Sequence, residues 1–324
     1  MNLVFVTGGN DAFFNSMLVF LQAFAERLPG QRLAVCDFGF TAAQAQFLRG
    51  LGVLLERPAI VEPRGVFHCK AALLSYLRHN ACAPGKDDLV VWLDADLTLM
   101  ETGAGDFAAV GAGMAAAGID IAVCPEPLGR SLGRMLSGPN QSAMAPTVRV
   151  IAQAGIDQSL RYVSSGLFFC RDPAFLSRWQ ELTLAVAEHP LFEQNMFNVA
   201  LHERRRPFLA LDCEEWQAQA WSLDRVRLVS SGSGRTAAHI GGKNVKTLHT
   251  TSPGQGHLLI GVCRMTVREI ELVGPFKLFM AEALRLHQLQ LLASFLVTQG
   301  EALLRLGICT RAARPVDGFE FVTL

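Results

Sequence analysis

The sequence predicts an α/β fold with a mostly parallel central sheet and helices on both of its faces. Along the first 125 residues, short apolar runs alternate with helical patterns, and this alternation is typical of βαβ units. The run at 89–93 is apolar without a break and ends in acidic residues. Uninterrupted apolar runs of this length indicate strands that are buried on both faces of a parallel sheet.

The first half of the chain supplies most of the elements of that sheet. The segment 13–27 has the pattern of an amphipathic helix and connects two short apolar runs. The predicted strands are 3–7, 32–36, 53–55, 89–93 and 119–124, and the predicted helices are 13–27, 42–51 and 69–80.

The second half begins with residues 127–146, which are rich in Gly, Ser and Pro and lack periodicity, so we expect a long loop there. Regular structure then resumes. The predicted strands are 162–170, 208–211, 226–229 and 245–249, and the predicted helices are 173–188 and 191–203. From about Phe276 to Leu306 the chain is leucine-rich and is expected to be helical, with a packing or oligomer-forming role.

The composition excludes several classes of protein. Half of the 324 residues are hydrophobic, which provides a large core, and 29 basic residues balance 29 acidic ones. A nucleic-acid-binding protein would usually have a basic excess. The eight cysteines are scattered without a Cys-x-x-Cys pair, which favours buried thiols in a reducing compartment over disulfides or zinc. No secretory signal or apolar run of about 18 residues is found, so we expect a cytoplasmic protein without a transmembrane segment.

Asp94 and Asp96 are the strongest functional signal in the chain, because they follow directly on the apolar run at 89–93. In an extended segment, side chains at i and i+2 point to the same side. Ligands of open α/β sheets bind beyond the carboxyl ends of the strands. Two adjacent carboxylates repel unless a cation relieves them, and their hard oxygens favour Mg²⁺ or Mn²⁺ with a phosphate as the further partner. Capping of a following helix is the structural alternative.

The segment Trp92-Leu93-Asp94-Ala95-Asp96 resembles the metal motif of the GT-A nucleotide-sugar glycosyltransferases, and most closely that of glycosyltransferase family 8. Further segments resemble the family in the expected order. They are Phe5 to Phe14 for the nucleotide-binding turn, Tyr162 to Phe168 for the strand beside the donor sugar, Phe192 to Asn198 for the Asp-Gln-Asp-x-x-Asn helix, and Lys246 to His249 for the late strand with a metal ligand.

The resemblance implies a role for individual residues. Glu193 and Gln194 would orient and stabilise the cation-like anomeric carbon, and Asp94, Asp96 and His249 would hold Mn²⁺ or Mg²⁺. The residues expected to contact the nucleotide-sugar donor are Thr7, Gly8, Asp11, Phe14, Lys70, Asp94, Ala95, Ser165, Gly166 and Lys246.

The third metal ligand has two candidates. His239 keeps a His-x-Gly-x-Lys spacing with Lys243, whereas His249 follows the better strand. An imidazole ligand suits Mn²⁺ better than Mg²⁺. Lys70 likewise has two interpretations, a contact to the donor phosphates or sugar and an ordinary solvated lysine.

The resemblance thus predicts a hexosyltransferase that moves a sugar from a nucleotide diphosphate donor, most simply a UDP-sugar, to a glycan, lipid-linked or protein hydroxyl. Family 8 implies retention of configuration. The expected parts are a nucleotide-sugar-binding half at 1–125, an acceptor and donor-sugar half at 126–250 and a helical C-terminal extension at 251–324, through whose helices the chain could form oligomers.

Two other functions stay open. Asp94-x-Asp96-x-Thr98 also fits the opening motif of haloacid-dehalogenase-like phosphatases, in which the first aspartate is the nucleophile. A non-catalytic nucleotide-sugar-binding protein is the second alternative. Hydrolysis of a phosphomonoester would identify the former, and metal-dependent nucleotide binding without turnover the latter.

Overall fold

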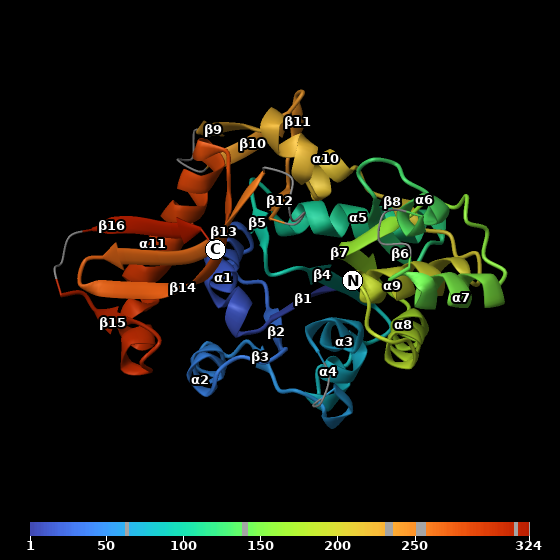
Figure 1. The fold of residues 1–324 in the computed structure, drawn as a ribbon, viewed down its shortest axis with the longest axis horizontal. Coiled ribbons are helices and arrows are strands. Elements are labelled where there is room, and N and C mark those ends of the chain that lie inside the picture. The colour runs from blue at the N-terminus through green and yellow to red at the C-terminus, as the bar shows by residue number, and fades with distance from the viewer. Residues whose placement is uncertain (62–64, 138–141, 231–235, 251–256, 314–316, 324) are drawn as a thin grey trace. The chain divides into compact units, whose positions relative to one another are not determined.

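The computed structural model describes residues 1–61, 65–137, 142–230, 236–250, 257–313 and 317–323 (Figure 1). The chain forms two compact units, each assembled from separate segments. Unit 1 comprises residues 1–6, 55–93 and 105–213, and unit 2 comprises residues 7–54, 94–104 and 214–324. The chain passes from unit 1 to unit 2 within strand β1 (Asn2–Gly9) and again directly after strand β4 (Asp88–Leu93).

Unit 1 contains a mixed sheet whose strands mostly run in one direction. The strand order is β1, β4, β7 (Val163–Cys170), β6 (Ile121–Pro125) and β8 (Leu209–Ala210). β1 is parallel to β4 and β6 is parallel to β8, whereas β7 is antiparallel to both of its neighbours. The predicted mixed α/β class with a mostly parallel sheet is therefore confirmed, with β7 as the strand of opposite direction.

Aromatic packing joins the helices of unit 1 to this sheet. Trp179 of α8 and Phe197 of α9 meet edge to face, and both rings contact Phe168 of β7. Large rings in such contacts add stabilisation beyond their buried area. The α-helices are α3 (Val66–Ala71), α4 (Leu73–His79), α5 (Ala104–Ala117), α6 (Leu132–Leu136), α7 (Ala145–Gln153), α8 (Pro173–Ala185) and α9 (Phe192–His202).

Three of these helices, α5, α6 and α7, were not predicted from the sequence. Helix α5 was not expected, because a segment made largely of Ala and Gly has little amphipathic contrast. Helix α6 lies inside the stretch at 127–146 that was expected to be a loop. Ser131 accepts a hydrogen bond from the backbone of Arg134 and starts α6. Residues 138–141 of the same stretch lie outside the described part of the chain.

Unit 2 combines a short helical layer with small antiparallel sheets. β5 (Leu97–Leu99) pairs with β12 (Thr247–His249), and β10 (Thr236–Ile240) pairs with both β9 (Arg227–Ser230) and β11 (Lys243–Asn244). The other elements up to residue 225 include α1 (Phe14–Arg27), β2 (Leu33–Asp37), α2 (Ala42–Gly50), the short strand β3 (Leu54–Leu55), the short helix α10 (Cys213–Trp216) and the 3₁₀ helices Asp11–Phe13 and Ala220–Arg225.

The C-terminal segment is only partly helical, which corrects the prediction of a helical extension. β13 (Leu258–Val267) and β14 (Ile270–Phe279) form a long hairpin, and β16 (Gly318–Thr323) and β15 (Thr310–Arg311) complete a four-stranded antiparallel sheet. Arg268 adopts a left-handed conformation in the hairpin turn. Because that turn lacks the Asn-Gly or Asp-Gly pair that usually signals one, the hairpin was not apparent from the sequence.

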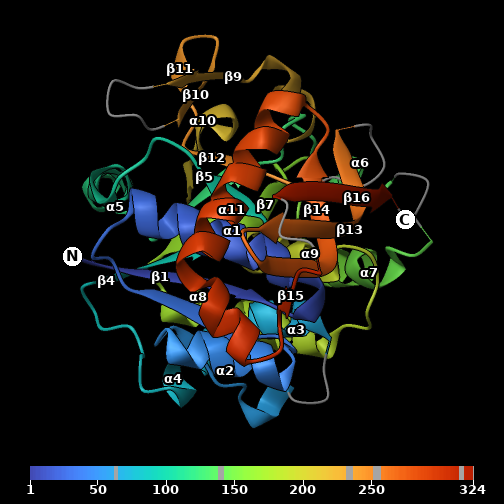
Figure 2. The ribbon, with the colours of Figure 1, turned by 90° about the vertical axis from the view of Figure 1, so that its left-hand side faces the viewer.

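Helix α11 (Glu282–Arg305) therefore begins after β14 and not at Phe276. It packs against α1 and against β14 within unit 2 (Figure 2). The Phe295 ring meets Phe47 of α2 with its edge. The leucine stripe of this helix is thus largely used inside unit 2. Among the described residues, no helix combines the length and the hydrophobicity that crossing a membrane requires.

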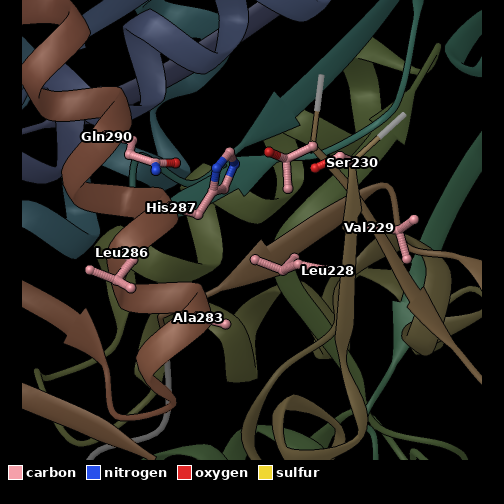
Figure 3. A pocket seen from close by; sticks show the side chains of 8 residues that line it. Leu228, Val229, Ser230, Ala283, Leu286, His287 and Gln290 are labelled. Carbon is pink, nitrogen blue, oxygen red and sulfur yellow. The ribbon is translucent and has the colours of Figure 1, made fainter. Parts of the chain in front are cut away.

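A surface pocket of about 250 Å³ lies between α11 and the β9–β10 hairpin of unit 2 (Figure 3). His287 of α11 lines it and is only 7% exposed, and neither of its ring nitrogens has a hydrogen-bond partner among the described residues. Burial, followed by the charge of Arg27, lowers the pKa of His287 to about 4. The imidazole is therefore neutral at pH 7.

Candidate functional site

The segment after β4 is a tight turn and not an extended strand. The Leu97 amide donates to the Asp94 carbonyl oxygen at 3.0 Å, so that Ala95 and Asp96 occupy the corner between β4 and β5. The expectation that Asp94 and Asp96 share a face because the chain is extended is therefore wrong. A turn closed by this hydrogen bond brings both carboxylates to the same end of the strand by another route.

Strand pairing brings His249 to that turn. In the β5–β12 ladder His249 is opposite Leu97. Beyond it, the Thr250 amide and Oγ1 both donate to the Asp96 carbonyl oxygen, at 3.1 and 3.0 Å. These contacts place His249 Nε2 at 3.0 Å from Asp96 Oδ1 and at 3.8 Å from Asp94 Oδ2.

Asp94, Asp96 and His249 form a group with the geometry of a metal site. Each residue offers one ligand atom, and the three atoms lie within 4.8 Å of one another. Two carboxylate oxygens and one imidazole nitrogen are a suitable donor set for Mn²⁺ and acceptable for Mg²⁺. His249 and Asp96 are nearly buried, whereas the Asp94 side chain is 23% exposed. The alternative ligand, His239, lies opposite Asn244 in the β10–β11 hairpin and does not belong to this group.

Gln217 lies behind His249 and was not singled out from the sequence. The backbone of Ala218 pairs with β12 through Thr247 and His249, which places the Gln217 amide 2.9 Å from His249 Nδ1. The oxygen and nitrogen of such an amide are interchangeable in assignment. Without a cation, Nε2–H faces Asp96 and the Gln217 amide nitrogen faces Nδ1. With Nε2 bound to a metal, the ring proton would lie on Nδ1, and a turned Gln217 amide would accept from it through its oxygen. A single buried glutamine carries no sequence signal for this role.

The Gln217→Leu variant is expected to bind Mn²⁺ about 10- to 100-fold more weakly, because the ring of His249 would lose the group that fixes its tautomer and orientation. Isothermal titration calorimetry with Mn²⁺ measures the change. Gln290→Leu, on the exposed face of α11 in the same unit, is the matched control and should bind Mn²⁺ as the parent does. Equal Mn²⁺ affinity of Gln217→Leu and the parent would exclude this role of Gln217.

Lys277 of β14 is the second residue that sequence reasoning missed. Its Nζ lies 3.2 Å from Asp96 Oδ2 and 4.3 Å from the centre of the Phe13 ring. Burial raises the pKa of Asp96, but the charges and hydrogen bonds of His249 and Lys277 outweigh it and hold that pKa well below its usual range. Asp96 is therefore ionised at neutral pH. Lys277 lies in a segment that was expected to be helical, so nothing in the sequence placed it near residue 96.

In unit 1, four of the predicted donor-site and catalytic residues come together. Lys70 Nζ of α3 donates to Ser165 Oγ of β7 at 3.2 Å and lies 3.8 Å from Glu193 Oε1 of α9. It is also 5.7 Å from the centre of the Trp92 ring. Gln194 Oε1 accepts from the Ser165 amide at 3.1 Å. Lys70 is 8% and Glu193 4% exposed, so Lys70 is not an ordinary solvated lysine.

Neighbouring polar side chains hold this unit 1 cluster in place. Gln194 Nε2 donates to the Tyr162 hydroxyl, which donates to Asn195 Oδ1 at 2.7 Å. Burial raises the pKa of Tyr162, so the phenol stays protonated. Asn198 accepts from the Val163 amide and donates to the Val163 carbonyl, at 2.8 and 2.9 Å, and thereby fixes α9 to β7.

The predicted nucleotide-binding turn belongs to unit 2 and is partly buried. The Thr7 and Phe14 side chains are 0% and 2% exposed, whereas Asp11 is exposed. A side chain at Gly8 would overlap the ring of Phe38, which explains the glycine. Asp11 and Phe14 also line a pocket of about 240 Å³, together with Thr41, Gln44 and residues of β14.

The remaining predicted donor contacts have different positions. Ala95 is buried in the turn between Asp94 and Asp96. Gly166 is buried on β7, and its amide donates to Ser164 Oγ. Lys246 directly precedes β12, and its carbonyl accepts from the Met100 amide at 2.9 Å.

Comparison with known proteins yields matches among solved structures alone, since no family model and no curated protein matches the chain. An active-site mutant of LgtC has a TM-score of 0.47 at 12% identity, covering 79% of this chain and 89% of that one. Mouse xyloside xylosyltransferase 1 has a TM-score of 0.44 at 14% identity, and the match covers 77% of this chain and 97% of that one. The bifunctional glycosyltransferase WbbM has a TM-score of 0.44 at 10% identity. The match covers 67% of this chain and 40% of the WbbM chain.

Proposed function

We propose that this protein is a metal-dependent glycosyltransferase of the GT-A class, acting on a nucleotide diphosphate sugar. The observation that carries the proposal is the group formed by Asp94, Asp96 and His249, whose side chains meet although His249 and Asp96 are 153 positions apart in the chain. Two carboxylates at the end of a sheet strand with an imidazole beside them bind a divalent cation that a diphosphate can share.

The chemistry at this group follows from its donor atoms. Asp94 and Asp96 would each supply one oxygen and His249 its Nε2. A cation bound there supplies a Lewis acid that stabilises the negative charge on a departing nucleoside diphosphate. Asp96 is held in place by Thr250 and His249, whereas the more exposed Asp94 faces solvent and gives access.

For unit 1 we propose that Glu193 and Gln194 act on the transferred sugar. The anomeric carbon becomes cation-like as its bond to phosphate breaks, and the Glu193 carboxylate would stabilise that charge electrostatically. Gln194 is fixed by Ser165 and Tyr162 and would orient the sugar through its amide. Lys70 balances the buried charge of Glu193 in the absence of substrate.

The donor, the acceptor and the stereochemistry belong to the same proposal. The family 8 resemblance favours a UDP-sugar, Mn²⁺ and retention of configuration, with a glycan, lipid-linked or protein hydroxyl as acceptor. Thr7, Gly8, Asp11 and Phe14 would form the turn beside the nucleotide, with Gly166 and Lys246 as further donor contacts. We also propose a cytoplasmic location and oligomer formation through α11.

A thermal-shift panel of UDP-, GDP-, ADP- and CMP-sugars, each with Mn²⁺ or with EDTA, tests the proposal. A ligand at 100 times its dissociation constant adds about 2.7 kcal/mol to the free energy of unfolding, which gives a clear rise in Tm. We expect UDP-sugars to stabilise the protein with Mn²⁺ and to lose most of that effect in EDTA. A panel without any nucleotide-dependent shift, together with Mg²⁺-dependent hydrolysis of p-nitrophenyl phosphate, would favour the phosphatase instead.

A further inference from the structure

The ammonium of Lys277 contacts Asp96, which is one of the three candidate metal ligands. Lys277 lies on β14, opposite Ile260 of β13, and its side chain is 29% exposed. Its Nζ contacts Asp96 Oδ2 at 3.2 Å and lies over the ring of Phe13. The two oxygens of Asp96 are thus divided between two partners, because Oδ1 faces His249 Nε2 at 3.0 Å.

This arrangement has a consequence for cation binding. A divalent ion held by Asp94, Asp96 and His249 would share Asp96 with a positive charge in direct contact with that carboxylate. Like charges at such short separation repel strongly where water is largely excluded. Asp96 is nearly buried, so solvent screens the repulsion poorly. A free cation should therefore bind weakly as long as Lys277 keeps its contact with Asp96.

Lys277 can leave Asp96 if another anion takes the place of Asp96 as its partner. A lysine side chain is a flexible four-carbon stem with three donors, and this one is partly exposed. A diphosphate that shares the cation would bring the required negative charge to the same place. Phe13, which already contacts the ammonium, lies in the turn of the candidate nucleotide site, so that Lys277 joins the metal turn to the nucleotide turn within unit 2.

We propose that Lys277 is a built-in counter-ion of Asp96 that makes the binding of the divalent cation and of the nucleoside diphosphate interdependent. Without nucleotide, Lys277 neutralises Asp96 and competes with the cation. With both ligands bound, it transfers its contact from Asp96 to the diphosphate. The inference rests on the proposed metal-dependent function of the site and adds an order to it: the cation alone binds weakly, and the cation with the diphosphate binds tightly.

The test is a calorimetric titration of the full chain with Mn²⁺, in the absence and in the presence of saturating UDP. Without UDP, Lys277→Met should bind Mn²⁺ about tenfold or more tightly than the parent, because the repulsion is gone. The increase in Mn²⁺ affinity that UDP causes should shrink by a similar factor. Lys277→Arg, which keeps the charge, should stay close to the parent in both titrations.

Arg264→Met is the matched control for net charge. Arg264 is on β13 of the same sheet, 55% exposed, and pairs with Glu271 and Glu320 on its surface, so its loss should leave both affinities unchanged. Lys277→Gln provides a second neutral variant if the methionine lowers the Tm.

The outcomes separate this inference from the proposed function. If the neutral Lys277 variants bind Mn²⁺ no more tightly than the parent in the absence of UDP, while Mn²⁺ binding itself is measurable, the counter-ion role is wrong and the metal site stands. If neither the parent nor the Lys277 variants bind Mn²⁺ with or without UDP, the metal site is wrong and the inference falls with it. If the parent binds UDP with the same affinity in the absence and in the presence of Mn²⁺, the binding of nucleotide and cation is not interdependent, and the inference is wrong.

Discussion

Replacing Asp96 by asparagine is expected to reduce sugar transfer by about 10³-fold or more, because the cation site would lose a charged ligand worth several kcal/mol of transition-state stabilisation. Asp96 is the residue on which the group converges, since it contacts both His249 and Lys277. The release of UDP from a UDP-sugar in the presence of Mn²⁺ measures the loss. Asp94→Asn should cause a comparable loss with a smaller change in Tm, because Asp94 is the more exposed of the two.

Asp224→Asn is the matched control for this experiment. Asp224 is an acidic residue of the same unit, 70% exposed and paired with His257 at 3.4 Å, and its replacement should leave UDP release unchanged. Undiminished UDP release by Asp96→Asn, with a normal Tm, would remove the cation from the mechanism. Trapping of a phosphoryl group on Asp94 would instead identify the phosphatase that the Asp94-x-Asp96-x-Thr98 pattern left open.

The second large effect is expected for Glu193→Gln, which should lower kcat by about 10²-fold or more when turnover is measured well below the Tm of the variant. The reason is that a neutral amide cannot stabilise a cation-like anomeric carbon as a carboxylate does. Glutamine is the appropriate substitution, because it keeps the shape of the side chain. It leaves the buried Lys70 without its counter-charge, which costs about 3–5 kcal/mol of stability, so the Tm should fall as well. Glu193 is 4% exposed and faces Lys70 at 3.8 Å.

A structural ion pair is the competing explanation for Glu193, and Glu203→Gln distinguishes the two. Glu203 is the residue directly after the end of α9, and its carboxylate pairs with Arg178 at 2.8 Å. Loss of the Glu203 charge should therefore affect stability alone. A lowered Tm with full turnover in Glu193→Gln would assign Glu193 a purely structural role. The double variant Lys70→Met/Glu193→Gln, which removes both charges, would then recover the stability without changing kcat.

The fold class could be predicted from the sequence because local patterns encode it. The apolar runs at 3–7, 89–93 and 119–124 became the strands β1, β4 and β6, and the intervening amphipathic segments became helices. Hydrophobic periodicity reports which face of an element is buried. It does not report strand direction, and so the reversed direction of β7 could not be predicted.

Elements with weak local signals were missed. Helix α5 has little contrast between its faces, and the β13–β14 hairpin turns at Arg268 without a glycine or asparagine. In both cases tertiary packing compensates for a weak local preference. The sequence therefore correctly predicted a long helix that ends near residue 306, which is α11. It did not predict the antiparallel sheet that precedes α11.

The sequence by itself determined the class of fold and the chemistry of the candidate groups, because residue types such as Asp94, Asp96 and Glu193 carry their chemistry wherever they lie. Tertiary structure decided between the two candidate histidines, and it alone added Lys277 and Gln217 to the group. The β5–β12 ladder brings His249 to Asp96, the strand β14 delivers Lys277, and the segment before Ala218 supplies Gln217. Contacts between residues more than a hundred positions apart are set by strand pairing and packing, which leave no mark on the neighbouring sequence.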